Sequence, residues 1–326
     1  MWRRRCRRPS RRIKHAFDEL LTSDFNSLGR LALIVDGVHF AEHFCVVALG
    51  IDAVCTEHSL AVTEGDAENA TVVKLWDGET LQEYADTTVT LPSAAEMAGF
   101  DTLEVEITQD CPDPDKIEIG NCGAWDYIAS LSIEDAAMTT QTEIARFITS
   151  YHRATHWVVD VSEMLPLLAA GGSQAFRWSF APSWNTQPTA TKLSLRFSNQ
   201  NKGMRPTIAI PLFTGGDFGS MYNVGRAPVD APIPADAKKV ELWTLTTGHG
   251  SGTNQCSEFC DHQHEFTVGT AVHVQDFPGA GTNAGCIAEI ANGMTPNQAG
   301  TWWFGRGGWC PGEEVKPWVV DVSSEV

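Results

Sequence analysis

Two short stretches of the sequence each place an acidic residue next to an aromatic ring and close to cysteines. In residues 122–126, Asp126 follows Trp125 and comes four residues after Cys122, where an extended segment (residues 127–133) begins. A carboxylate held rigidly beside a large ring suits a group that must be aimed at a substrate. A loop acid that pairs with a nearby arginine fits this stretch equally well, so both interpretations stay open here.

The second stretch, residues 256–260, favours the functional interpretation. Glu258 lies beside Phe259 and is enclosed by Cys256 and Cys260. A second acid in the same kind of setting makes a purely structural explanation of the first one less convincing. These two carboxylates are therefore the first candidates for chemistry in the chain.

The cysteines predict a disulfide-bonded protein. Six of the nine lie in the body of the chain, and their spacing suggests the pairs Cys111–Cys122, Cys256–Cys260 and Cys286–Cys310. Sequence alone does not fix the connectivity. Paired cysteines indicate an oxidising compartment, so we expect a secreted, periplasmic or cell-surface protein. A zinc site is disfavoured, because the C-x₃-C pair at Cys256 has no second C-x₂-C partner.

The charge distribution separates a basic head from an acidic body. The formal net charge is −18, although residues 1–14 hold seven Arg and one Lys and no acid. An acidic body repels phosphate backbones, so we expect no nucleic-acid partner. No run of about 18 apolar residues occurs, so no transmembrane segment is expected. The head and the apolar runs at residues 31–35 and 44–51 predict a targeting-like, poorly ordered region over residues 1–66.

The remaining sequence predicts an all-β fold. Residues 102–107 alternate apolar and acidic side chains, as a half-buried strand does. Residues 162–170 are expected to form one short helix with Ser162 as its cap and Gly171 and Gly172 at its end. Short strands between Gly, Asp and Pro indicate an antiparallel sandwich or jelly roll. Further strands are expected at residues 71–76, 87–91, 144–150, 157–161, 176–180 and 192–197.

A polar, glycine-ended segment at residues 199–203 marks the best domain boundary. A chain of 326 residues has room for two domains, because single cores stop growing at roughly 250 to 300 residues. We therefore predict one jelly roll over residues 67–200 and a second over residues 204–326. In the second half, strands are expected at residues 207–213, 239–246, 265–274 and 317–322.

Four motifs occur in the order and spacing of the peptide-N-glycosidase F family, which the chain resembles over about residues 68–326. They are Cys-Gly-Ala-Trp-Asp (122–126), Glu-Ile-Ala-Arg-Phe-Ile-Thr-Ser-Tyr (143–151), Cys-Ser-Glu-Phe-Cys (256–260) and Gly-Gly-Trp-Cys-Pro-Gly (307–312). The resemblance implies two antiparallel jelly rolls packed side by side and disulfides that match the three suggested pairs. It also implies that the second jelly roll is incomplete, because the family's second domain continues beyond the length of this chain.

The resemblance implies an amidase that hydrolyses the bond between an Asn side chain and the first N-acetylglucosamine of an N-glycan. No metal or cofactor is required, and the site lies between the two domains. The main catalytic acid corresponds to Asp126, which would draw a proton from water. A second acid corresponds to Glu258. An arginine that orients Glu258 or steadies the oxyanion corresponds to Arg306.

Substrate contacts are assigned to four rings: Trp125, Phe259, His249 and Trp309. The expected substrate is an N-glycoprotein or glycopeptide, and the expected state is a monomer. Three departures from the family pattern stand out. Residues 177–184 contain no acid where the family has a third one, Tyr127 replaces a usual Arg, and His249 lies near the position of an expected Trp.

Two other functions remain open at this point. A non-catalytic carbohydrate- or protein-binding module on the same scaffold would account for the missing third acid. A relative of the copper monooxygenases, which share the architecture, is suggested by His249, His262 and His264. That chemistry needs ligands in both domains. His152 and His156 lie in a loop-to-strand region where their spacing does not place them on one face.

Overall fold

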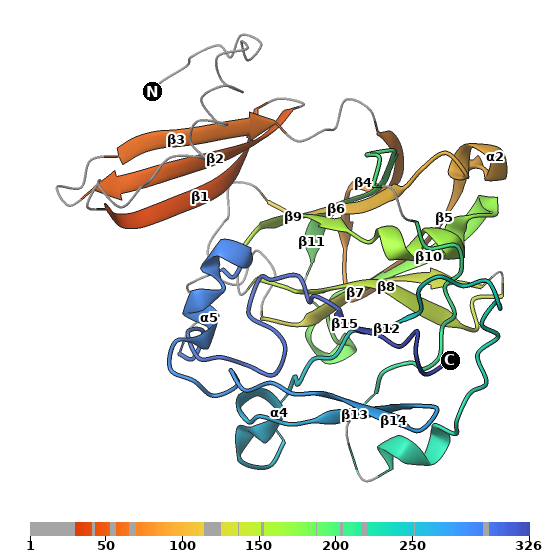
Figure 1. Cartoon of the computed structure of the whole chain (residues 1–326). Helices are drawn as coiled ribbons and strands as arrows, with labels where there is room; N and C mark the ends of the chain where they lie inside the picture. Colours follow the sequence, from red (N-terminus) through yellow and green to blue (C-terminus); the bar gives the residue numbers. More distant parts are fainter. Residues whose placement is uncertain are drawn as a thin grey trace. The chain divides into compact units, whose positions relative to one another are not determined.

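A computed structural model describes residues 30–40, 43–52, 57–64, 70–113, 125–135, 137–150, 153–186, 188–202, 205–216, 219, 221–250, 252–295 and 300–326. The chain divides into two compact units, Met1–Ala70 and Thr71–Val326. The first unit contains an antiparallel sheet of β1 (Arg30–Phe40), β2 (His43–Asp52) and β3 (Glu57–Glu64), in that order (Figure 1). The apolar runs assigned to a targeting segment lie in β1 and β2. The Arg-rich head lies outside the described residues.

The second unit begins with a sandwich of two four-stranded antiparallel sheets, formed by residues within Thr71–Ser198. One sheet has the order β4 (Thr71–Leu81), β11 (Thr189–Ser198), β6 (Thr102–Asp110) and β9 (Thr155–Asp160). The other has the order β5 (Tyr84–Ser93), β10 (Gly171–Ser179), β7 (Ile128–Glu134) and β8 (Gln141–Ile148). Strands far apart in sequence are neighbours in both sheets, as jelly-roll connectivity requires (Figure 1). The predicted all-β fold class is confirmed.

The core of the sandwich follows the predicted alternation along β6. Leu103, Val105 and Ile107 are fully buried, while Glu104 and Glu106 lie on the opposite, partly exposed face. Aromatic rings fill the space between the sheets, with Phe147 centred 5.2 Å from Trp157 and 6.0 Å from Trp178. Each large side chain buried in this way contributes about 1.5–3 kcal/mol.

In place of the helix predicted at residues 162–170, the structure has two shorter helical segments, and Ser162 makes different contacts from those expected. The structure has η3 (Ser162–Met164) and α3 (Leu165–Leu168), and after a two-residue turn Gly171 and Gly172 begin β10. Ser162 does not cap a helix: its hydroxyl donates to Asp160 and accepts a hydrogen bond from the Leu103 amide at 3.0 Å. The other short helices among the described residues are α2 (Ala94–Met97), η4 (Ser183–Asn185), η5 (Tyr222–Gly225), η6 (Thr253–Gln255), α4 (Cys256–Phe259), α5 (Gly285–Ala288) and η7 (Ile290–Asn292).

Short antiparallel ladders characterise the second half of this unit. β12 (Glu241–Thr244) pairs with β15 (Trp318–Asp321), and β13 (His264–Val268) pairs with β14 (Ala271–Gln275). The single strand predicted at residues 265–274 is therefore a hairpin, which reverses at Gly269 with φ +59°. The strand predicted at residues 207–213 is wrong, because residues 205–216 carry no strand.

Backbone pairing joins this second half to the sandwich. β8 is the last strand of its sheet, and it gains a partner in residues 313–315. The Ile148 amide donates to the Glu313 carbonyl at 2.8 Å, and the Val315 amide donates to the Arg146 carbonyl at 2.9 Å. The indole of Trp157 donates to the Gly312 carbonyl at 2.9 Å. These contacts fix residues 312–315 against the first half.

A buried acid within this junction makes stability depend on pH. The side chain of Glu313 is 7% exposed, and burial raises its pKa to about 8, with a further contribution from the charge of Glu289 and a smaller opposing one from Lys316. Because the folded pKa exceeds the unfolded value of 4.5, the folded state holds more protons between these limits. The free energy of unfolding should therefore fall by a few kcal/mol as the pH rises through this window.

Urea unfolding at pH 5 and pH 8, compared between the wild type and Glu313→Gln, measures this effect. We expect the variant to lose most of the difference between the two pH values. If both proteins lose stability in parallel, Glu313 is not the responsible group.

Candidate active site

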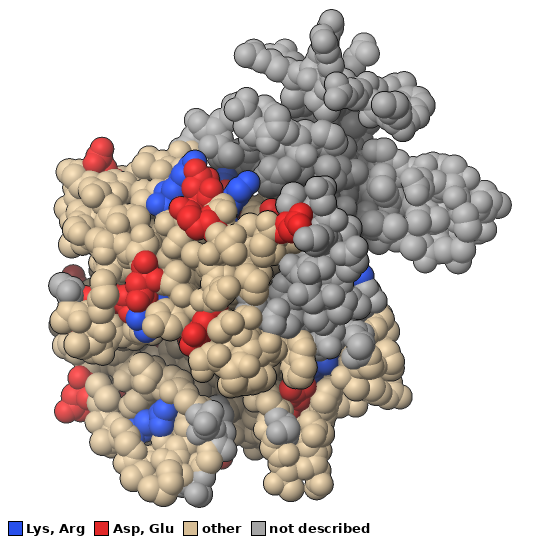
Figure 2. Space-filling model, turned by 180° about the vertical axis from the view of Figure 1, so that it is seen from behind, with Lys and Arg blue, Asp and Glu red and all other residues tan. Residues whose placement is uncertain are grey.

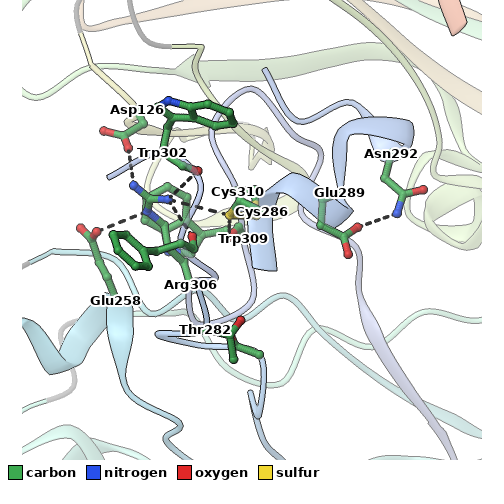
Figure 3. Close-up of a disulfide and its surroundings, with 12 residues drawn as sticks. Asp126, Glu258, Thr282, Cys286, Glu289, Asn292, Trp302, Arg306, Trp309 and Cys310 are labelled. Carbon is green, nitrogen blue, oxygen red and sulfur yellow. Dashed lines mark hydrogen bonds and ion pairs between the residues drawn. A yellow bond between two sulfur atoms is a disulfide. The ribbon is translucent and has the colours of Figure 1, made fainter. Parts of the chain in front are cut away.

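The guanidinium of Arg306 lies between the two candidate acids. Its Nη2 is 3.9 Å from Oδ2 of Asp126, and its Nε is 3.5 Å from Oε2 of Glu258. The side chain of Arg306 is 1% exposed, whereas those of Asp126 and Glu258 are 14% and 18% exposed. Figure 3 shows both carboxylates pointing toward the guanidinium from different segments. The three residues assigned to catalysis are thus brought together.

Asp126 is positioned by a threonine that follows β8. The hydroxyl of Thr149 donates to the Trp125 carbonyl at 2.5 Å and accepts a hydrogen bond from the Tyr127 amide at 2.8 Å. The Thr149 amide also donates to the Tyr127 carbonyl at 2.9 Å. The backbone is therefore held on both sides of Asp126, which limits the positions that its carboxylate can take.

Glu258 lies on α4, inside the Cys256–Cys260 disulfide. The Gly250 amide donates to its Oε1 at 3.2 Å, and the Gly307 amide donates to its backbone carbonyl at 2.8 Å. The disulfide and these two hydrogen bonds fix the acid relative to the segment that carries Arg306.

Arg306 is enclosed by rings and backbone. The guanidinium carbon lies 5.2 Å from the ring centroid of Phe259 and 4.7 Å from that of Trp309. Its Nη1 donates to the Phe304 carbonyl at 3.2 Å. A Cβ atom at Gly305 would lie 2.0 Å from the Gly279 carbonyl oxygen, so only glycine permits this close approach. Arg306 is therefore a fixed charge within the site.

Burial gives Glu258 a proton affinity above that of an exposed glutamate. Burial raises its pKa, and the charge of Asp126 adds to this, while His249 and Arg306 act in the opposite direction. Burial lowers the pKa of Arg306, and the two carboxylates oppose that effect. A carboxyl whose pKa is raised next to a second carboxyl is the arrangement in which one acid donates and the other accepts a proton.

The four rings assigned to substrate contact differ in exposure. Trp125 is 47% exposed, whereas Trp309 is 4% exposed and donates from its indole to the Gly248 carbonyl at 2.8 Å. Phe259 is half-buried against Arg306. The ring of His249 stacks on Trp309, with centroids 4.5 Å apart. Trp125 thus offers an open surface, and Trp309 forms a wall behind the site.

Three further residues beside Asp126 were not assigned from the sequence. The ring of Tyr127 stacks on Trp125 with centroids 6.2 Å apart and meets Trp184 edge-on at 5.9 Å. Asn185 donates to the Tyr127 hydroxyl at 2.6 Å. Trp184 is 73% exposed. The Pro-Ser-Trp-Asn sequence could have indicated an exposed ring, because a turn of this kind does not bury a tryptophan in the core.

The disulfides agree with the suggested pairing where the structure describes them. Cys256–Cys260 and Cys286–Cys310 are both formed. Cys111 is disulfide-bonded, and Cys122 lies outside the described residues.

The stretch that lacks the family's third acid, residues 177–184, begins with an arginine that makes ion pairs. Arg177 binds Asp86 at 2.5 Å and approaches Glu134 at 3.3 Å.

Two of the three histidines that suggested a metal site, His262 and His264, pack against each other and a phenyl ring. The ring centroids of His262 and His264 are 5.1 Å apart, and they lie 5.0 and 5.8 Å from that of Phe277. Burial lowers the pKa of His264 to about 4, with His262 acting in the same direction. Among the described residues, no group of three or more His, Cys, Asp and Glu side chains is arranged to hold a metal ion.

Charged side chains of both signs are interspersed over the described part of the face in Figure 2, and most of that surface is uncharged. This part of the surface presents no broad basic field of the kind that binds a phosphate backbone. Within the described residues, helices are too short or too polar to span a bilayer.

Comparison with known proteins relates the chain to amidases. Residues 217–326 match the family described as "Peptide-N-glycosidase F, C terminal". Over 301 residues, the chain is 25% identical to peptide-N(4)-(N-acetyl-beta-D-glucosaminyl)asparagine amidase F from Elizabethkingia miricola. The match covers 84% of this chain and 80% of that protein.

Solved structures agree with the fold. PNGase F, described as a glycosylasparaginase from Flavobacterium meningosepticum, matches with a TM-score of 0.51 and 18% identity, over 78% of this chain and 84% of that one. PNGF-II matches with a TM-score of 0.51 and 13% identity, over 89% of this chain and 75% of that one. At these identities, the likeness concerns the two-domain jelly-roll architecture.

Proposed function

The chain belongs to the peptide-N-glycosidase F family, and from this premise we propose that it is an amidase acting on N-glycosylated proteins or peptides. The bond cleaved is the amide between an Asn side chain and the first N-acetylglucosamine of the glycan. The observation that carries the proposal is the contact of one buried arginine, Arg306, with two acids from distant segments, Asp126 and Glu258. Folding alone gives little reason for this arrangement, because burying several charges costs free energy.

The proposed reaction uses the two acids differently. Asp126 accepts a proton from water as the water oxygen bonds to the amide carbon. Arg306 steadies the negative charge that develops on the amide oxygen. The carbon–nitrogen bond then breaks, and Glu258 supplies a proton to the departing nitrogen. The products are an aspartate in the peptide and a glycosylamine on the glycan.

The exposed rings are proposed to hold the sugar. Aromatic faces pack well against the apolar faces of sugar rings. Trp125 and Trp184 are exposed, and both contact the ring of Tyr127, which follows Asp126. Phe259 and Trp309 shape the wall around Arg306. His249 is also proposed to touch the substrate, next to Trp309, on which its ring stacks.

Release of free N-glycan from a denatured glycoprotein tests the proposal. The purified, oxidised chain is incubated with the substrate, and the released glycan is separated and quantified. We expect release without added metal. No release from folded protein, for several common N-glycan types, would contradict the proposed activity.

Glu258→Gln should distinguish the proton donor from a purely structural acid. The glutamine can keep the hydrogen bond from the Gly250 amide but has no proton to give. We expect the turnover rate to fall by about 10²-fold or more. Because the pKa of Glu258 is raised and the protonated form acts, wild-type activity should fall as the pH rises through that pKa. If the variant keeps the wild-type pH profile, Glu258 is not the donor.

A carbohydrate-binding module is the second candidate, favoured by the exposure of Trp125 and Trp184. Such a module would bind glycopeptides without cleaving them. Titration of a glycopeptide monitored by tryptophan fluorescence, with products analysed afterwards, separates the two functions. Binding with no product would favour the module.

The proposed location is secreted, periplasmic or cell-surface, and the Cys256–Cys260 and Cys286–Cys310 disulfides support an oxidising compartment. We further propose that the chain is a monomer. A dimer mass in size-exclusion chromatography with light scattering would contradict this.

A further inference from the structure

His249 touches the catalytic segment through its backbone. Its Nε2 lies 2.5 Å from the backbone carbonyl oxygen of Asp126. A carbonyl oxygen only accepts hydrogen bonds, so Nε2 carries the hydrogen in this contact. The two residues are 123 positions apart in the sequence. This hydrogen bond links the loop before α4 to the segment before β7.

One face of the imidazole is held by stacking. Its ring lies 4.5 Å from that of Trp309 with an interplanar angle of 25°. Trp309 in turn donates to the carbonyl of Gly248, next to His249, at 2.8 Å. Gly248 and Gly307 pair as an antiparallel bridge, with the Gly248 amide 2.7 Å from the Gly307 carbonyl. The ring therefore has one fixed orientation.

We infer that His249 is a positioning residue, which holds Asp126 in place relative to Glu258 and Arg306. This inference rests on the proposed function, because it concerns the same reaction. His249 acts through the Asp126 backbone, while the Gly250 amide beside it orients Glu258. One loop thus sets the positions of both acids.

In its protonated form His249 has a second effect on the site. Together with His249, the charged groups that act on Glu258 are Asp126 ahead of β7 and Arg306 in the loop after η7. The ring of His262 lies against Gly248, next to His249. A positive charge on His249 lowers the pKa of Glu258. Loss of the imidazole should therefore shift the part of the pH profile that reports Glu258 to higher pH.

Two variants separate the contacts of His249. His249→Phe keeps a ring that stacks on Trp309 but has no hydrogen-bond donor. His249→Gln keeps an N–H that reaches toward the Asp126 carbonyl but has no ring. We expect the phenylalanine variant to lose about 10-fold or more in kcat with a smaller change in KM. The glutamine variant should recover part of that loss, and both should show the shifted pH profile.

His273→Phe is the matched control, because His273 lies on β14 and its Nε2 contacts Glu325 at 3.6 Å. It should leave both kcat and the pH profile unchanged. Equal losses in the two His249 variants, without a pH shift, would overturn the inference.

A measurement without substrate keeps this inference separate from the proposed function. Long-range ¹H–¹⁵N spectra of the wild-type protein should show the His249 imidazole with its hydrogen on Nε2. A neutral ring protonated on Nδ1 would overturn the inference, whether or not the protein cleaves glycans. If the Nε2 tautomer is found but no glycan is released, the result would contradict the proposed function and not the position of His249.

Discussion

Replacing Asp126 with asparagine is expected to lower the rate of glycan release by about 10²- to 10⁴-fold, the range for loss of a general base. The amide is nearly the same size as the carboxylate but does not take a proton from water. Thr149 holds the backbone on both sides of residue 126, so the substitution should leave the local fold intact. The measurement is kcat for glycopeptide cleavage, together with affinity for the uncleaved substrate.

Asp86→Asn is a suitable control for Asp126→Asn. Asp86 also contacts an arginine, Arg177, but it lies on β5, away from Arg306. It should leave kcat unchanged. A variant of Asp126 with wild-type kcat would remove this residue from the mechanism and would favour the binding-module interpretation.

Replacing Arg306 with alanine is expected to reduce both activity and stability. The guanidinium is 1% exposed and lies between two acids, so its removal leaves partly buried acids without their cation. Breaking a buried ion pair by removing one partner costs about 3–5 kcal/mol. The lost contact to the developing oxyanion should reduce kcat by about 10²-fold or more. Urea unfolding and glycopeptide kinetics measure the two effects separately.

Arg306→Lys and Arg177→Ala help to interpret that result. Lysine keeps the charge but does not reproduce a planar group that faces two acids, so it should recover stability more than activity. Arg177→Ala removes an arginine that binds Asp86 and Glu134 outside the site, and it should affect stability without changing kcat. Wild-type kinetics in Arg306→Ala would contradict the assigned role.

Local sequence patterns predicted much of the sandwich because each strand carries its own signal. The alternation of Leu103, Glu104 and Val105 corresponds directly to the buried and exposed faces of β6. The hairpin at Gly269 was missed because one glycine separates two short runs that read as a single strand. The backbone pairing of residues 313–315 with β8 involves no local periodicity. It depends on tertiary contact, so no short window reveals it.

The sequence allowed the charged residues of the candidate site to be predicted, but not the contacts of its uncharged residues. Asp126 and Glu258 stood out because each lies beside an aromatic ring and close to cysteines. Arg306 was assigned through the family resemblance. Asn185 and Trp184 reach the site only through η4, a turn whose position follows from the packing of β10 and β11. The contact of His249 with the Asp126 backbone likewise joins segments 123 residues apart.

Cleavage of a defined N-glycopeptide in H₂¹⁸O, followed by mass spectrometry of both products, is the sharpest test of the proposed amidase reaction. Water attack on the amide carbon predicts a peptide with aspartate in place of the glycosylated asparagine, carrying one ¹⁸O in the new carboxyl group. The glycan should be released with its complete chitobiose core. A peptide that keeps an N-acetylglucosamine on its asparagine, or an intact glycopeptide, would contradict hydrolysis of this amide bond.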